Sequence, residues 1–193
     1  MIPFHRLDVP ATPVGPLILI ASERGLWHLH FGGDPGGDPK DHREGDRSHP
    51  ILGPAAQALE AYFGGASDPF HDLPLDLHGR TSFQLQVLRA LQRIPRGSVR
   101  SYGDLAEELG RGSPRAVGQA VGANPIPIVI PCHRVVARDR RLGGFSGGLD
   151  RKVLLLEREG VQVEGHVFRS RIRIESDREP GPRKGSVSAR ASG

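Results

Sequence analysis

The 193-residue sequence contains one cysteine, Cys132, and this scarcity excludes several kinds of protein. One thiol cannot form an internal disulfide, a four-cysteine zinc site or a redox cycle between two cysteines of one chain. The sequence also has no apolar run of about 18 residues, so we expect no membrane-spanning segment and no membrane partner. Its first residues lack the basic-then-apolar order of a signal peptide, and we therefore expect a cytoplasmic protein.

Charge is distributed unevenly along the chain. Residues 1–79 contain 5 Lys and Arg against 11 Asp and Glu, whereas residues 80–193 contain 21 against 11. This contrast predicts an acidic supporting domain at 1–79 and a basic, polyanion-binding domain at 80–169. The stretch 170–193 is rich in Pro, Gly, Ser and Arg, which predicts a disordered basic tail. Charge alone leaves open a solvated basic surface without a polyanion partner.

The N-terminal half has the pattern of a small α+β unit. Val14 to Ala21 and Leu26 to Phe31 are short aliphatic runs around a Ser-Glu-Arg-Gly turn, which predicts a β-hairpin. The stretch 32–50 is crowded with Gly, Asp, Pro and His and predicts a mobile surface loop. Pro54 to Phe63 has the alanine and leucine content of a helix that a glycine pair ends.

The C-terminal half is predominantly helical, and two of its helices form a helix-turn-helix pattern. A first helix is predicted over 81–94 from apolar residues at helical spacing. The next begins at Ser101, with Asp104 in the position that completes a capping box. The third begins at Ser113, a favourable N-cap followed by proline, and runs to Asn124. Such helix pairs often only pack together, so DNA binding and simple packing remain alternatives.

A segment with three alternating prolines holds the chain extended before Cys132 and His133. A thiol with an ordinary pKa of about 8.5 needs a base, and an adjacent histidine can supply one. On a regular strand the two side chains would point to opposite faces, so they can cooperate only if the backbone turns or a water bridges them. Glu159 ends a helix predicted over 150–159, where the helix dipole disfavours an acidic residue. It is therefore a candidate to orient His133, with a solvated surface glutamate as the alternative.

These motifs together resemble the O6-alkylguanine-DNA alkyltransferases, also called methylated-DNA–protein-cysteine methyltransferases. The segment Ile130-Pro131-Cys132-His133-Arg134-Val135-Val136 is similar to the active-site signature of that family. The segments 101–106, 115–118, 124–125 and 147–148 follow the family's order and approximate spacing. The resemblance implies an α+β fold with a small N-terminal α/β unit, ribonuclease H-like, and a helical C-terminal domain with a winged-helix-like helix-turn-helix.

The resemblance also implies an activity, the irreversible repair of DNA by transfer of an alkyl group from O6 of guanine to Cys132. Transfer from O4 of thymine is left open. His133 would take the thiol proton through a water, with Glu159 orienting its ring, and Tyr102 would stabilise the departing guanine. Arg115 would replace the flipped base in the stack. The residues expected to bind DNA or the base are Arg115, Asn124, Arg134, Val135, Ser146, Ser113 and Ala116. The partner would be alkylated double-stranded DNA, bound by a monomer.

Three features depart from the family's pattern. Phe145 stands before Ser146 at a position where a tyrosine is common in the family. The aromatic wall therefore remains without its phenol, a change that bears on the preference among alkyl groups rather than on the chemistry. The stretch 32–50 and the tail have no counterpart that we can assign. The zinc ligands that some relatives carry in the N-terminal domain are absent, so we predict no metal and no cofactor.

Three other functions fit parts of the pattern. A sensor that flips alkylated bases without repairing them would lack the reactive cysteine, which is commonly tryptophan in relatives of that type. A DNA-binding regulator with a structural Cys132 would bind particular sequences and accept no alkyl group. A cysteine hydrolase would turn over repeatedly and would need an oxyanion hole, which the loop 143–148 could hold. The heptad around Cys132 places alkyl transfer above these three.

Overall fold

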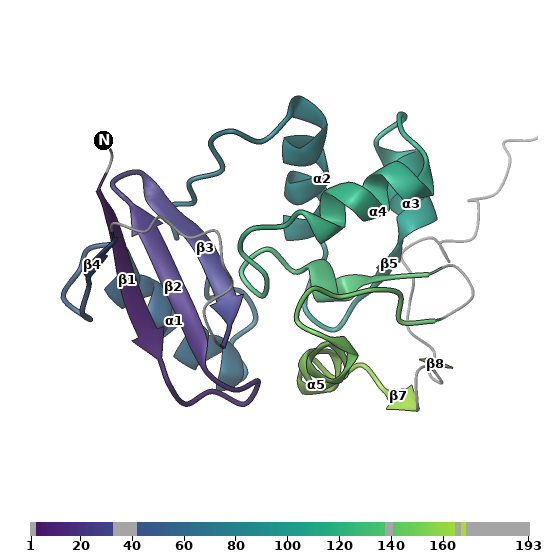
Figure 1. Cartoon of the computed structure of the whole chain (residues 1–193). Coiled ribbons are helices and arrows are strands. Elements are labelled where there is room, and N and C mark those ends of the chain that lie inside the picture. The colour runs from purple at the N-terminus through teal and green to yellow at the C-terminus, as the bar shows by residue number, and fades with distance from the viewer. Residues whose placement is uncertain (1–2, 33–41, 138–140, 165–166, 169–193) are drawn as a thin grey trace, which may run out of the picture.

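The computed structural model describes residues 3–32, 42–137, 141–164 and 167–168 (Figure 1). Two units lie side by side, a sheet with one helix and a group of helices. We call the first the N-terminal unit and the second the C-terminal unit. The N-terminal unit consists of β1 (Phe4–Val9), β2 (Leu17–Ser22), β3 (Gly25–Phe31), β4 (His42–Glu44) and α1 (Leu52–Phe63).

The four strands form one sheet in the order β3-β2-β1-β4. The predicted β2–β3 hairpin is confirmed, with antiparallel pairing of Leu17 to Phe31 and of Ile18 to His30. Every residue of β2 is buried, which agrees with its uninterrupted aliphatic sequence in the middle of a covered sheet. Helix α1 packs against β1 and β2 and covers one face of the sheet (Figure 1).

The sheet corrects the prediction that 32–50 is a mobile loop. Within that stretch, His42–Glu44 forms β4, which pairs in parallel with β1. Gly45 continues the connection, since its N–H donates to the Arg6 carbonyl at 2.7 Å. Residues 33–41 lie outside the described residues. A strand of three polar residues has no hydrophobic pattern of its own and forms because β1 offers a free edge.

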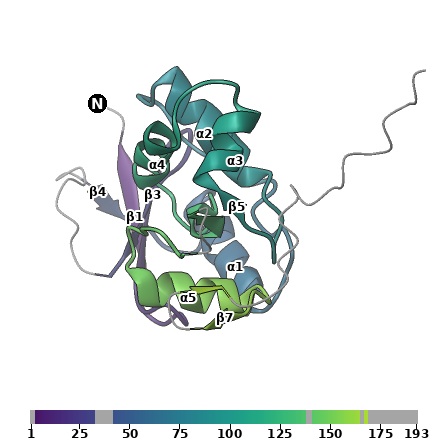
Figure 2. The ribbon, with the colours of Figure 1, turned by 90° about the vertical axis from the view of Figure 1, so that its right-hand side faces the viewer.

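The C-terminal unit contains the predicted helices in the predicted order. Figure 2 shows α3 and α4 next to each other, and α5 lies at the opposite end of the unit. The elements are α2 (Ser82–Gln92), β5 (Arg100–Ser101), α3 (Tyr102–Glu108), α4 (Pro114–Gly122), η1 (Cys132–Arg134), β6 (Val135–Val136), α5 (Leu149–Arg158), β7 (Val163–Glu164) and β8 (Val167–Phe168). The α+β class and the helix-turn-helix of α3 and α4 are therefore confirmed.

Side-chain caps fix where these helices begin. Ser101 accepts from the Asp104 N–H while the Asp104 carboxylate accepts from the Ser101 N–H, so the predicted capping box is present. Ser113 accepts from the Ala116 N–H at 3.2 Å and caps α4. Short polar side chains thus satisfy helix donors that would otherwise lack partners.

Most buried apolar side chains of the two units form one continuous core, beside a smaller cluster in the C-terminal unit that includes Val136 and Leu156. The continuous core runs from β2, with Leu19, through Leu59 of α1 to Val117 of α4 and Leu155 of α5. The units therefore share buried surface, and the segment that carries Cys132 lies within this shared core. No helix in the described part of the chain is long and apolar enough to span a membrane. The predicted tail over 170–193 lies outside the described residues.

Candidate functional site

Asn124 holds the turn that leads to Cys132. Its amide Nδ2 donates to the Ile130 carbonyl at 2.8 Å, and its Oδ1 accepts from the Ile126 N–H at 3.1 Å. Ile128, at the tip of this turn, has a φ of 73°, which a β-branched residue rarely adopts. The buried amide thus stabilises a strained backbone, and the strain shows that the turn is tightly determined.

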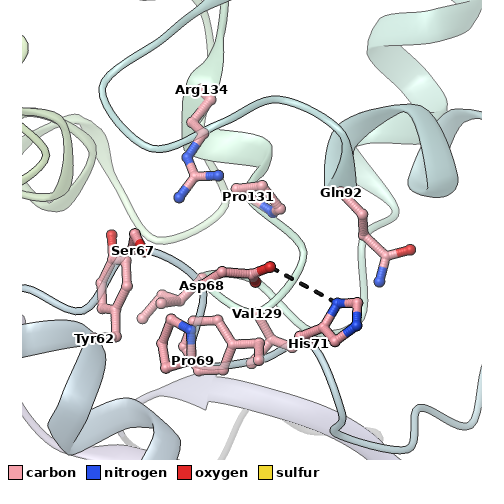
Figure 3. Close-up of a pocket in the computed structure, with 11 residues that line it drawn as sticks. Tyr62, Ser67, Asp68, Pro69, His71, Gln92, Val129, Pro131 and Arg134 are labelled. Carbon is pink, nitrogen blue, oxygen red and sulfur yellow. Dashed lines mark ion pairs between the residues drawn. The ribbon is translucent and has the colours of Figure 1, made fainter.

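Two cavities flank the segment that follows this turn. The first, which we call the Asp68 cavity, has a volume of about 260 Å³ and lies between the loop after α1 and the prolines before Cys132 (Figure 3). Its wall includes an exposed ion pair of Asp68 with His71, 3.8 Å apart, together with Pro131 and Arg134. Cys132 does not line it. Among the described residues no cluster of His, Cys, Asp and Glu could hold a metal ion.

The second cavity contains the thiol, and we call it the thiol pocket. It has a volume of about 240 Å³ and is open toward α4. Its wall brings together residues from four separate parts of the C-terminal unit, namely Tyr102, Gly118, Val121, Gly122, Cys132, Gly144, Phe145 and Ser146. The wall of the pocket therefore includes a nucleophile, a phenol and a second aromatic ring.

The thiol itself is a weak acid in this environment. Cys132 is 4% exposed, and burial raises the pKa of its thiol to about 11. A hydrogen bond from Asn124 and the charge of Lys152 act in the opposite direction but do not cancel the effect of burial. Only a small fraction of the protein holds a thiolate at neutral pH, so the site needs a base to remove the proton.

His133 is placed to be that base because the backbone turns at this point. Cys132–Arg134 forms a turn of 3₁₀-helix, so the two side chains are not held on opposite faces of a strand. The Nε2 atom of His133 lies 2.9 Å from Oε1 of Glu159. Its Nδ1 atom is buried and has no hydrogen-bond partner among the described residues. Burial lowers the pKa of His133, which keeps the ring neutral and able to accept a proton.

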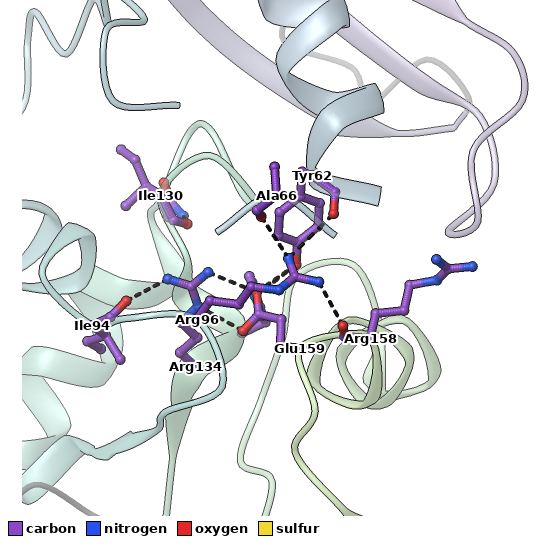
Figure 4. A network of polar contacts seen from close by, with 10 residues as sticks. Tyr62, Ala66, Ile94, Arg96, Ile130, Arg134, Arg158 and Glu159 are labelled. Carbon is purple, nitrogen blue, oxygen red and sulfur yellow. Dashed lines mark hydrogen bonds and ion pairs between the residues drawn. The ribbon is translucent and has the colours of Figure 1, made fainter. Parts of the chain in front are cut away.

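Glu159 is the centre of a buried polar network (Figure 4). Its carboxylate accepts from His133, from the Tyr62 hydroxyl at 2.7 Å, and from Nε and Nη2 of Arg134, both at 2.9 Å. Burial by itself raises the pKa of Glu159, but the hydrogen bonds from His133 and Arg134 outweigh burial, and the pKa lies well below its ordinary value. Glu159 is therefore a buried carboxylate rather than a solvated surface residue.

The network also contains Arg134, which the sequence predicted to bind DNA. Arg134 is 8% exposed, and its guanidinium donates to Glu159 and to the Ile94 carbonyl at 2.5 Å. These bonds hold the side chain inside the protein, on the wall of the Asp68 cavity (Figure 3). The sequence did not indicate this burial, and a contact of Arg134 with DNA stays a prediction.

The other predicted base-binding residues divide into surface and buried positions. Arg115, Ser113 and Ala116 lie at the start of α4, where Arg115 and Ser113 are exposed. Ser146 is exposed at the thiol pocket. Val135 is buried, and its carbonyl accepts from the Lys152 ammonium at 2.6 Å.

Tyr102 and Phe145 are the two aromatic residues that line the thiol pocket. The Tyr102 ring packs next to Gly118 and Gly143. Burial and the nearby Cys132 raise the pKa of Tyr102, so its hydroxyl stays protonated and can donate a hydrogen bond. Phe145 makes an edge contact with Phe31 of β3, and Gly147 fits between these two rings where a Cβ would collide with both.

Sequence reasoning missed two members of the site, Tyr62 and Lys152. The Lys152 ammonium donates to the carbonyls of Val135, Leu142 and Gly144, and burial lowers its pKa to about 8. A signal was available, because Lys152 lies at helical spacing on the same face as the buried Leu155 and Leu156. No comparable signal marked Tyr62, which lies at the end of an apolar helix.

This site on this fold defines a DNA-binding protein with a buried, base-assisted cysteine, and comparison with known proteins identifies the family. The ribonuclease-like domain of 6-O-methylguanine DNA methyltransferase matches residues 8–77, and the DNA binding domain of the same protein matches residues 82–161. The chain belongs to the 6-O-methylguanine DNA methyltransferase family.

Relatives and solved structures agree with this assignment. The methylated-DNA–protein-cysteine methyltransferase of Mycolicibacterium paratuberculosis is 44% identical over 161 residues, which cover 82% of this chain and 93% of the relative. The enzyme of the same name from Methanosarcina barkeri is 43% identical over 155 residues, covering 79% and 95%. The crystal structure of Mycobacterium tuberculosis OGT in complex with DNA has a TM-score of 0.67 at 38% identity and covers 82% of this chain and 92% of that one.

Proposed function

We propose that this protein repairs DNA by direct reversal, moving an alkyl group from O6 of guanine to Sγ of Cys132. The observation that supports this most is the thiol pocket, in which the only cysteine of the chain lies beside a His133–Glu159 pair. The name of the family, 6-O-methylguanine DNA methyltransferase, gives the substrate class. O4-alkylthymine is a second candidate substrate with the same kind of alkyl–oxygen bond.

The reaction requires one bond to form as another breaks. His133 takes the thiol proton through a water at its free Nδ1, and Glu159 stabilises the imidazolium that results. The sulfur then attacks the alkyl carbon, the Sγ–C bond forms, and the C–O6 bond breaks with its electron pair left on guanine. Tyr102 donates a hydrogen bond or a proton to the departing base. A thioether has no easy leaving group and the chain has no second thiol, so each molecule acts once.

DNA is the partner that the family and the fold support, and we propose that α4 is the element that contacts it. Arg115, exposed in the first turn of α4, would fill the space left by the flipped base. Small residues such as Ala116 and Gly118 allow this helix to approach DNA closely. We further propose that the substrate is alkylated double-stranded DNA, that a monomer binds it, and that the division near residue 79 separates a supporting domain from a DNA-binding one. The cytoplasmic location stays a prediction.

The test is transfer of label from DNA that carries radiolabelled O6-methylguanine. We expect label on the wild-type protein to saturate near one methyl group per molecule and to be absent from Cys132→Ala. Peptide mapping should then find the added mass on Cys132.

Two results would contradict the proposal. Binding of the DNA without transfer would indicate a sensor or a regulator with a structural cysteine. Release of many repaired guanines per protein molecule would indicate a turnover enzyme such as a hydrolase.

A further inference from the structure

Tyr62 carries a hydroxyl from the N-terminal unit into the site of the C-terminal unit. It lies near the end of α1, is 1% exposed, and donates to Oε1 of Glu159 at 2.7 Å (Figure 4). The same hydroxyl oxygen is 3.4 Å from Nε2 of His133. It is thus the only side-chain hydroxyl bonded to the Glu159 carboxylate among the described residues.

The direction of these bonds follows from the chemistry of the partners. Glu159 is ionised and can only accept, so the Tyr62 hydroxyl must donate to it. Nε2 of His133 is 2.9 Å from the same oxygen and must also carry a proton to bond with it. The imidazole therefore keeps its lone pair on Nδ1, the atom that would receive the thiol proton. Nη2 of Arg134 donates to this oxygen as well, so three donors share it and compete for its charge.

Arg96 restrains the position of Tyr62. The guanidinium of Arg96 lies 5.0 Å from the centre of the Tyr62 ring and donates to the Tyr62 and Ala66 carbonyls, both at 3.4 Å. It also donates to the Arg158 carbonyl at 2.7 Å, next to Glu159. Arg96 thereby ties the end of α1 to the end of α5 (Figure 4). The hydroxyl has little freedom to leave the carboxylate.

We propose that Tyr62 is a positioning residue for proton transfer, through which the N-terminal unit sets the orientation of Glu159 and His133. This inference rests on the proposed function, because it concerns the base that activates Cys132. Through Tyr62 the N-terminal unit would help to orient the base, a role that its acidic sequence does not indicate.

The proposal predicts a shift of known sign in the pH dependence. Without the hydroxyl, Oε1 of Glu159 becomes a stronger acceptor for His133 and stabilises the imidazolium. The pKa of His133 then rises, and since the neutral ring is needed as base, the acidic limb of the rate profile moves to higher pH. The other ionisable groups around the ring are unchanged; they are Glu159, Arg134, Lys152, Cys132 and, above Tyr62, Arg96.

The experiment compares Tyr62→Phe with the wild type in two assays between pH 5 and pH 9, which is roughly the range in which histidine titrates. The first is single-turnover methyl transfer from O6-methylguanine DNA. The second is alkylation of Cys132 by iodoacetamide, followed by intact mass, which is unambiguous because the chain has one cysteine. We expect Tyr62→Phe to be about tenfold slower at pH 7, as for loss of a residue that orients a functional group. Its acidic limb should lie at higher pH in both assays.

A control variant and a tyrosine analogue distinguish loss of the hydroxyl from a general loss of stability. Ser22→Ala removes another buried hydroxyl–carboxylate bond of the N-terminal unit, from Ser22 to Asp76 at 2.6 Å, and should leave both profiles in place. Site-specific 3-fluorotyrosine at position 62 keeps the bond but strengthens the donor. It should move the acidic limb in the opposite direction, to lower pH.

The outcomes separate the inference from the proposed function. Absence of methyl transfer by the wild type refutes the proposed function, while the iodoacetamide profiles still report on Tyr62. If the profiles of Tyr62→Phe and the fluorotyrosine protein coincide with the wild type, Tyr62 only packs the core and the inference fails. It also fails if Ser22→Ala produces the same shift.

Discussion

The two units of this protein differ most in the polar groups that they bury. Among the described residues, the N-terminal unit and the loop that follows it bury Ser22, Asp76 and the hydroxyl of Tyr62. The C-terminal unit buries Ser101, Asn124, His133, Arg134, Lys152 and Glu159. Each unit thus buries one carboxylate, but with different partners. Asp76 accepts from the neutral Ser22 hydroxyl and from the His78 N–H, whereas Glu159 accepts from the cationic guanidinium of Arg134.

This difference between the units shows in which part of the fold charged side chains are buried. A charge inside a protein is expensive unless it is paired and fully hydrogen-bonded, and a region without chemistry has little reason to contain one. In the N-terminal unit the interior is almost entirely aliphatic, and the buried carboxylate on that side, Asp76, lies in the loop after it. In the C-terminal unit Arg134, Lys152 and Glu159 are buried in the unit that carries Cys132. The polar interior therefore marks the reactive part of the molecule more sharply than net charge does.

The largest difference is expected when each carboxylate is made neutral. Glu159→Gln leaves the Arg134 guanidinium buried without its counter-charge and should reduce the free energy of unfolding by about 3 to 5 kcal/mol. Asp76→Asn loses bonds with neutral donors only and should cost about 1 kcal/mol. Urea unfolding of both variants measures these values. Methyl transfer should fall on the order of 100-fold in Glu159→Gln alone. Equal losses of stability would show that the two sites are equivalent.

Acid should weaken the protein through the same carboxylate. The pKa of Glu159 is lowered in the folded state, so its contribution is present above the unfolded pKa of about 4.3 and is lost as the pH falls below that value. The difference in stability between wild type and Glu159→Gln should therefore shrink from pH 6 to pH 3. A constant difference over this range, measured by urea unfolding at each pH, contradicts the assignment.

A smaller effect is expected at Arg115, on the surface that we propose to contact DNA. Arg115→Ala should weaken binding to O6-methylguanine DNA by about tenfold, which is about 1.4 kcal/mol. Arg24→Ala, an equally exposed arginine in the β2–β3 turn, should leave the affinity unchanged. Fluorescence anisotropy at two salt concentrations tests both variants. If Arg24→Ala weakens binding as much as Arg115→Ala, the N-terminal unit also contacts DNA.

The smallest effect should come from an ion pair on the surface of the N-terminal unit. Arg47 and Glu60 are 2.7 Å apart, and both side chains are 57% exposed. Water screens such a pair, so Arg47→Ala should change the free energy of unfolding by about 0.5 kcal/mol or less. Arg134→Ala, which breaks the buried pair with Glu159, is the matched comparison and should cost several times more. Similar losses of unfolding free energy in Arg47→Ala and Arg134→Ala would show that the two units do not differ in this way.

The sequence allowed most of the fold to be predicted where the signal is local. Such local signals determine structure within a few residues. They include the hairpin turn, the N-caps Ser101 and Ser113, and the glycines after α1. The strands β1 and β4 were not predicted, because β1 mixes His, Arg and Asp with apolar residues and β4 has three polar residues. Their pairing joins segments far apart in the chain, and a sheet edge rather than a local pattern decides it.

The site was predictable where its residues lie in one motif, as Cys132 and His133 do, or against a local preference, as Glu159 does at the end of a helix. Cys132, His133 and Glu159 were identified, and the 3₁₀ turn then showed how the first two can cooperate. Tyr62 is 71 residues from His133 and 97 from Glu159, so no spacing connects them. The burial of Arg134 in the same network was not predicted either, because a sequence does not give the direction of a side chain.

The bonds of Arg96 to both α1 and α5 limit how the two units can be exchanged between proteins. A chimera that joins this C-terminal unit to another N-terminal unit would fold around the same apolar core only if the shapes match. It would keep the reactive geometry only if the donated helix ended with a tyrosine and with carbonyls in reach of that arginine. The two units thus meet through a specific contact. We expect sequence changes at the end of α1 to be coupled to changes at Arg96 and at the end of α5.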